Sequence, residues 1–288
     1  MDQKARAGYL IKYLEKEMPE YGRTEVPENA QEAFDLFRAF CNVRLPGPVS
    51  NRFLEVQDAY LKEEIRRKGI TDIRNLKPAT ADSRLYLWQG DITALRCDAI
   101  VNAANSGMLG CFRPLHNCID NAINTYAGVQ LRNYMAGRMA ELKEQYGAAY
   151  EQPMAVPMLS PAFNLPAKYI VHIVGPIAYP RLTKAHQEQL AACYREGLDL
   201  AAAHGCEHIA FCCVSTGVFM FPQEKAAEIA AETVTEWLDA HRSSCLKKVV
   251  FNVFKDSDFG CYQRLLDSSG TRGSGKTQRM EAVGSENA

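Results

Sequence analysis

The segment Asp98-Ala-Ile-Val-Asn-Ala-Ala-Asn-Ser106 decides the fold of this chain of 288 residues. Its apolar part, residues 99–103, is too short for a helix and predicts a buried strand. The strand leads into a loop with Asn102 near its start, followed by Asn105 and Ser106. Ligands of open α/β sheets bind beyond the carboxyl ends of the strands. Asparagines in this position are also ordinary turn residues, so the neighbouring segments must decide between a turn and a binding site.

Short apolar runs and helical patterns alternate on both sides of this segment. The other predicted strands are residues 85–88, 169–174, 209–214 and 249–254. The helical patterns between the strands cover residues 118–135, 184–204 and 223–241. This alternation predicts an α/β fold with three layers, α/β/α, around a mostly parallel central sheet.

The first eighty residues differ from the rest of the chain because they read as helices alone. Three helices are expected at residues 8–18, 29–43 and 49–68, and the second has one apolar face that needs a partner surface. We therefore divide the chain into a helical N-terminal extension (1–80), an α/β domain (81–266) and a tail (267–288). The tail contains four Gly and four Ser and little that could form a core, which predicts disorder.

Composition excludes several functional classes. There are 33 basic and 34 acidic side chains, and this balance argues against a general nucleic-acid clamp. No apolar run approaches the ~20 residues that a membrane helix needs, and no signal-peptide core follows Met1. We expect a soluble, cytoplasmic protein without a membrane partner. Its ten cysteines are then expected to be mostly reduced thiols.

Cys111, His116 and Cys118 have the spacing C-x4-H-x-C, which suits zinc because zinc prefers sulfur and nitrogen ligands. Residues two apart on a helix point to nearly opposite sides, so His116 and Cys118 share a metal only if a helix begins between them. Asn117 is a good N-cap, which would place Cys118 at N1 and Asp120 at N3. The helix dipole would then favour the Cys118 thiolate.

Three local ligands would leave one position of a zinc ion open, as in catalytic sites. A distant fourth thiol could instead close the site, and the candidates are Cys97, Cys212 and Cys213. The simpler alternative is that the three residues are two buried thiols and a core histidine. Spacing alone leaves these alternatives open.

A second segment with possible chemistry is Phe211-Cys-Cys-Val-Ser-Thr-Gly-Val-Phe-Met-Phe-Pro222. It joins a strand to a helix through a Ser-Thr-Gly loop, whose backbone N–H groups could bind phosphate oxygens without a basic side chain. The alternative to a phosphate-binding loop is a plain connection between a strand and a helix. After the last strand, Phe254 could lie against a base, although an aromatic residue there is more often part of the core.

Six ordered motifs together resemble the macrodomain family, and most closely its zinc-containing branch, the protein ADP-ribose hydrolases. The resemblance extends over residues 85–266, and the helical N-terminus resembles the extension of that branch. The motifs are Gly90-Asp-Ile-Thr93, Asp98-Ala-Ile-Val-Asn-Ala-Ala-Asn-Ser106, Met108-Leu-Gly-Cys-Phe-x-Pro-x-His-x-Cys-Ile-Asp-Asn-Ala-Ile123, Asn164-Leu-Pro-Ala-Lys-Tyr169, His172-x-Val-Gly-Pro-Ile177 and Ser215-Thr-Gly-Val-Phe-x-Phe-Pro222.

The resemblance implies roles for individual residues in binding ADP-ribose. Asp91 and Ile92 would read the adenine edge, and Phe254 would pack on the ring. Asn105 and Asp120 would orient the distal ribose and serve in catalysis. The diphosphate and distal ribose would lie on the backbone of Ser215, Thr216, Gly217, Val218 and Phe219. One Zn²⁺ per chain would be held by Cys111, His116 and Cys118.

The implied function is a zinc-dependent hydrolase that removes mono-ADP-ribose from O-linked, ester-type protein side chains and releases ADP-ribose. Water would attack either the anomeric carbon or the ester carbonyl. The alternatives are an ADP-ribose reader without turnover and a deacetylase of O-acetyl-ADP-ribose. The chain departs from the family pattern at Asn124, where a histidine is expected, and at residues 155–160, which usually carry glycine and threonine. These departures concern turnover more than the fold or ADP-ribose binding.

Overall fold

A six-stranded sheet forms the centre of the molecule. The computed structural model describes residues 1–22 and 24–267. The strand order is β2-β8-β7-β4-β6-β5, and every neighbouring pair is parallel except β5 with β6. The strands are β2 (Leu85–Gln89), β4 (Ala99–Ala104), β5 (Met158–Pro161), β6 (Tyr169–Val174), β7 (His208–Phe211) and β8 (Lys248–Val253). A separate parallel pair joins β1 (Thr71–Asp72) to β3 (Leu95–Arg96).

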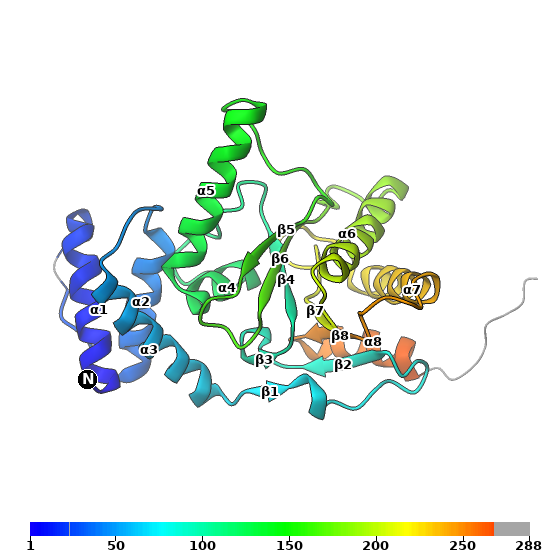
Figure 1. Cartoon of the computed structure of the whole chain (residues 1–288), viewed down its shortest axis with the longest axis horizontal. Helices are drawn as coiled ribbons and strands as arrows, with labels where there is room; N and C mark the ends of the chain where they lie inside the picture. Colours follow the sequence, from blue (N-terminus) through cyan, green and yellow to red (C-terminus); the bar gives the residue numbers. More distant parts are fainter. Residues whose placement is uncertain (23, 268–288) are drawn as a thin grey trace, which may run out of the picture.

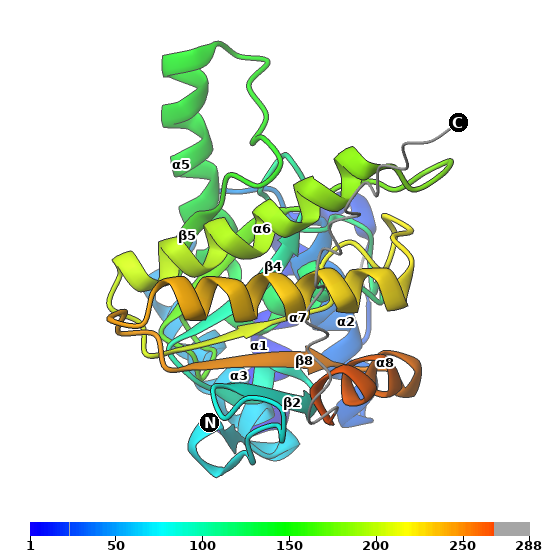
Figure 2. The ribbon, with the colours of Figure 1, turned by 90° about the vertical axis from the view of Figure 1, so that its right-hand side faces the viewer.

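Helices cover both faces of this sheet, which confirms the predicted three-layer α/β/α fold (Figure 1). Two helices, α4 (Ile119–Ala127) and α5 (Val129–Tyr146), lie on the side of the N-terminal helices. Figure 2 shows α6 (Lys184–Ala203) and α7 (Gln223–Ala240) side by side across the other face, with α8 (Asp256–Asp267) next to α7. Short 3₁₀ turns are η1 (Pro19–Tyr21), η2 (Ile73–Asn75) and η3 (Ile92–Ala94).

The N-terminal helices form a hydrophobic cluster of their own. They are α1 (Gln3–Glu17), α2 (Ala30–Val43) and α3 (Asn51–Lys68), and each begins at a side-chain cap, Asp2, Asn29 or Ser50. Phe37 and Phe53 are fully buried in this cluster, which also includes Val129 of α5. The extension therefore packs on the α/β domain through α4 and α5, and α2 contacts the segment that carries the metal motif.

The structure corrects several sequence expectations. The helix expected at 118–135 is broken at Gly128, whose φ of 94° is in the left-handed region. Its N-cap is Cys118 and not Asn117, because the Cys118 Sγ accepts the Asn121 N–H at 3.4 Å. The strand expected at 209–214 ends at Phe211. Asp267 of the expected tail closes α8, and residues 268–288 lie outside the described residues.

Strand β5 and helix α8 were not predicted from the sequence. Among the described residues, no helix is long and apolar enough to cross a membrane.

Candidate active site

The side chains expected to bind a ligand follow four neighbouring strands of the sheet. Asp91 follows β2, Phe254 follows β8, Ser215 follows β7 and Asn105 follows β4. These strands are adjacent and parallel in the order β2-β8-β7-β4. Their carboxyl ends therefore lie on one edge, and the four residues form a row along it.

Asp120 is the buried centre of this edge. It lies in the first turn of α4, and only 6% of its surface is exposed. Three side-chain amides donate to its carboxylate: Asn102 at 2.8 Å and Asn124 at 3.0 Å to Oδ1, and Asn105 at 3.3 Å to Oδ2. Burial raises the pKa of Asp120 to about 6, although the amide donors oppose this shift.

A second layer of buried polar side chains lies behind Asp120. The other Asn102 Nδ2–H meets the His172 Nδ1 at 3.1 Å, and the His172 Nε2 lies 2.9 Å from the Ser160 Oγ. Ser160 donates to the Pro161 carbonyl, so the His172 Nε2–H donates to Ser160 and its Nδ1 accepts from Asn102. Burial lowers the pKa of His172 to about 3, which keeps the ring neutral.

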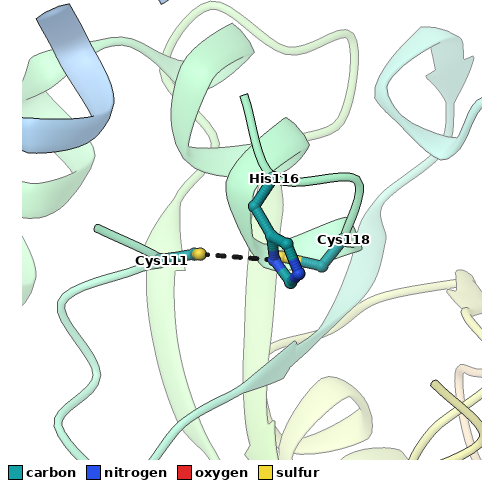
Figure 3. A group of neighbouring side chains, drawn as sticks. All are labelled: Cys111, His116 and Cys118. Atoms are coloured by element: carbon teal, nitrogen blue, oxygen red, sulfur yellow. Dashed lines mark hydrogen bonds between the residues drawn. The ribbon is translucent and has the colours of Figure 1, made fainter. Parts of the chain in front are cut away.

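The three residues of the metal motif converge beside the start of α4 (Figure 3). One donor atom from each of Cys111, His116 and Cys118 lies within 4.8 Å of the others, and the Cys111 Sγ is 3.5 Å from the His116 Nδ1. None of the alternative ligands Cys97, Cys212 and Cys213 joins this group of described residues.

The expectation of a lowered Cys118 pKa is wrong, because burial raises the pKa of its thiol to about 12. Desolvation of the thiolate outweighs the helix dipole at this half-buried position. A cation that replaced the proton would favour the thiolate at this position.

The loop after β7 has the features of an anion-binding turn. Ser215 has a φ of 66°, and its side chain packs against Gly175, where a Cβ would lie 2.1 Å from the Ser215 Oγ. Among the described residues, the N–H groups of Gly217, Val218 and Phe219 donate to no backbone carbonyl. The Ser215 Oγ is likewise buried without a partner in the described part of the chain. This loop therefore has donors available for a ligand.

At the far end of the edge, Asp91 and Phe254 follow the neighbouring strands β2 and β8. Asp91 caps η3 through its Oδ1, and its Oδ2 pairs with the Lys68 Nζ at 2.6 Å. The Lys68 ammonium also lies 3.2 Å from the centre of the Tyr126 ring. Phe254 is 71% exposed, so the core interpretation of this residue is wrong and its ring is free to pack on a ligand.

Sequence reasoning missed the residues that support this site from a distance. Arg132 of α5 is buried and donates to the Leu109 carbonyl at 2.7 Å. Arg38 of α2 donates to the Asn121 side chain and to the His116 carbonyl. His172 belongs to the motif His172-x-Val-Gly-Pro-Ile177, and this motif was the one sequence signal for it. Arg38 and Arg132 gave no signal, because a single arginine on a helix is usually a surface residue.

Comparison with known proteins identifies the family. A model of the Macro domain family matches residues 101–230. A protein-ADP-ribose hydrolase of Treponema medium is 48% identical over 92% of this chain and 100% of the relative. A protein-ADP-ribose hydrolase of Staphylococcus aureus (strain MSSA476) is 45% identical over 92% of this chain and 96% of the relative.

A solved structure agrees with these sequence matches. The Trypanosoma brucei macrodomain in complex with ADP-ribose superposes with a TM-score of 0.59 at 27% identity, covering 77% of this chain and 92% of that chain. The chain therefore belongs to the macro domain family and is a hydrolase.

Proposed function

We propose that the protein is a zinc-dependent hydrolase that removes mono-ADP-ribose from O-linked, ester-type side chains of other proteins and releases ADP-ribose. One observation carries this proposal: a convergent Cys111, His116 and Cys118 group stands at the N-terminus of the helix that carries the buried Asp120. The relatives that span the chain are protein-ADP-ribose hydrolases, and the ester-type linkage follows the family resemblance. We assign residues 81–266 to the macrodomain and 1–80 to its helical extension.

The order of the strands supports one orientation of ADP-ribose. Adenine would lie at the β2 and β8 ends, between Asp91, the Ile92 backbone and the exposed Phe254 ring. The diphosphate would lie on the β7 loop, from Ser215 through Thr216, Gly217 and Val218 to Phe219, whose backbone donors suit phosphate oxygens. The distal ribose would then lie at the β4 end, near Asn105 and Asp120. The ligand's three parts thus follow the spatial order of the strands.

Asp120 is proposed to align the distal ribose through one of its two carboxylate oxygens. Its Oδ1 already accepts from Asn102 and Asn124, whereas among the described residues its Oδ2 accepts one longer bond, 3.3 Å, from Asn105. A ribose hydroxyl would therefore donate to Oδ2, and fixed amides would hold that oxygen in place. Asn124, the departure from the family pattern, supports Asp120 in this arrangement instead of leaving it unsupported.

The donor set suits one zinc ion per chain, because two thiols and an imidazole are the ligands zinc prefers. Bound there, zinc would supply Lewis-acid polarisation of an oxygen at the reacting end of the ligand. The chain's own residues hold the ribose, and the three ligands hold the ion. The ten free thiols suit a reducing compartment, so we place the activity in the cytoplasm.

The test is release of ADP-ribose from a mono-ADP-ribosylated protein with an ester-type linkage, measured by mass spectrometry beside zinc content. We expect Cys118→Ala to lose zinc and to lower turnover on the order of 100-fold. Cys245→Ala is the matched control, because Cys245 is also a half-buried thiol but donates to the Ala202 carbonyl away from the site.

Full turnover by Cys118→Ala would contradict the role of the metal. Binding of ADP-ribose by calorimetry without turnover of any linkage would make the protein a reader. Hydrolysis of O-acetyl-ADP-ribose alone would make it a small-molecule deacetylase.

A further inference from the structure

The loop that carries the proposed zinc ligands is held from outside by the N-terminal extension. Residues 112–117 belong to no helix or strand, and within them Leu115 has a φ of 53°, in the left-handed region. A β-carbon disfavours that conformation, so the loop needs contacts that hold it there. Its internal support is small: the His116 N–H meets the Arg113 carbonyl at 3.2 Å, and the Cys118 N–H meets the His116 carbonyl at 2.9 Å.

Helix α2 supplies two of the missing contacts. The Arg38 Nη2 donates to the His116 carbonyl at 3.0 Å. The Asn42 side chain, which is 1% exposed, accepts the Leu115 N–H at 3.0 Å and donates to the Thr125 Oγ1 at 3.2 Å. Asn42 is therefore satisfied at both ends and holds the left-handed residue against α4.

Arg38 also acts through Asn121, a fully buried residue of α4. Its Nε and Nη2 lie 2.9 Å and 2.7 Å from the Asn121 Oδ1. Asn121 in turn donates to the Arg113 carbonyl at 3.0 Å, and its N–H meets the Cys118 Sγ at 3.4 Å. One guanidinium on α2 thus fixes the backbone on the amino side of His116 and the helix turn that presents Cys118.

We infer that α2 is a positioning element of the Cys111, His116 and Cys118 group, and that Arg38 and Asn42 are positioning residues for it. They hold the loop in the conformation in which the three donor atoms converge, so an incoming divalent cation need not order the loop. This inference rests on the proposed zinc site and assigns the N-terminal extension a role in it. Preordering of ligands is expected to appear as tighter binding and slower release of the cation.

The experiment compares full-length wild type with Arg38→Met, which keeps the packing of the stem but removes the guanidinium. Zinc affinity is measured by competition with a colorimetric chelator, and zinc release by its rate of transfer. We expect the Kd for zinc to rise 10- to 100-fold and release to accelerate. Asn42→Ala, which frees the Leu115 N–H, should act in the same direction.

Two further variants separate positioning from general stability. Arg38→Lys keeps the charge but loses the planar fork that reaches Asn121 and His116 together, so its affinity should be intermediate. Arg52→Met is the matched control, because Arg52 is an exposed arginine of the extension that pairs only with Glu55 of its own helix among the described residues. The thermal midpoint in chelator should stay within a few degrees of wild type for Arg38→Met.

Hydrogen exchange of metal-free protein provides a readout that does not need zinc. The amides of residues 111–118 should exchange at least about 10-fold faster in Arg38→Met, with the sheet unchanged. Wild-type zinc affinity and unchanged exchange in Arg38→Met would overturn the inference about α2. Failure of the wild type to bind zinc would instead overturn the proposed metal site, and the exchange data alone would then decide whether α2 holds the loop.

Discussion

The candidate site has two halves that are positioned in different ways. One half lies on the sheet, where Asn102 of β4 and His172 of β6 are paired in register and Ser160 lies on β5 beside them. The other half is the loop with Cys111, His116 and Cys118, which pairs with no strand in the described part of the chain. The ladder of backbone hydrogen bonds fixes each side chain of the first half, because neighbouring strands allow one register.

The loop half depends on side chains that are distant in the sequence. Arg38 reaches Asn121 across 83 positions, and Asn42 accepts the Leu115 N–H across 73. A site residue on a strand is thus positioned by the strands that pair with its own, whereas a ligand on the loop is positioned by side chains of the helices packed against the loop. The two halves should therefore respond differently to substitution.

The largest effect is expected where one residue serves both the loop and the extension. Arg132 donates to the carbonyls of Leu109, Cys41, Asn42 and Arg44, so Arg132→Met leaves buried acceptors without a donor. We expect a loss of about 4 kcal/mol in the free energy of unfolding. Urea unfolding measures this value. Arg138→Met, on the exposed side of the same helix, should stay within about 0.5 kcal/mol of wild type, and an equal effect of both variants would refute the bridging role.

The second-largest effect is expected in the sheet half of the site. Asn102→Leu removes the donor to the Asp120 Oδ1 and the partner of the His172 Nδ1, both of which are buried. We expect about 3 kcal/mol of destabilisation by urea unfolding, together with loss of turnover. Because the loop has its own supports, zinc affinity should change less than in Arg38→Met. A variant with normal stability but no zinc would contradict the separation of the two halves.

A pH dependence should come from the sheet half through His172. Its folded pKa of about 3 lies below the ordinary value of 6.5, so the unfolded chain takes up a proton first as the pH falls. Stability is therefore lost below pH 7, and the contribution between pH 7 and pH 5 is about 2 kcal/mol. The side chain of His172→Gln cannot titrate. Subtracting the unfolding free energy of this variant at each pH from that of the wild type isolates the contribution of His172. Parallel pH profiles of the two proteins would show that His172 does not titrate in this way.

The smallest effect tests a contact between the extension and the adenine end of the edge. Lys68→Met removes the 2.6 Å contact with Asp91 and the contact with the Tyr126 ring. Both charged groups are partly exposed, so we expect a loss of about 1 kcal/mol in unfolding free energy. Lys62→Met, an exposed position on the same helix, is the control. Calorimetry with ADP-ribose should show weaker binding for Lys68→Met only, and unchanged binding would separate Lys68 from the ligand site.

Much of the sheet could be predicted because its information is local. The apolar runs gave β2, β4, β6 and β8 to within a residue or so, since a buried parallel strand is a short continuous apolar segment. The antiparallel β5 was missed because its sequence, Met158–Pro161, is short and ends in proline. Gly128 was missed as a helix break because glycine inside a helical pattern is often tolerated.

By itself, the sequence determined the alternation of strands and helices, the spacing of Cys111, His116 and Cys118, and the polar residues that follow the predicted strands. Only the tertiary structure decided that Asp120 is buried among three amides and that the metal-motif loop is held by α2. The physical reason is the distance along the chain over which each kind of interaction acts. Periodicity and spacing act over a few residues, whereas the burial of Asp120 depends on packing within the α/β domain and the support of the loop depends on packing of the extension.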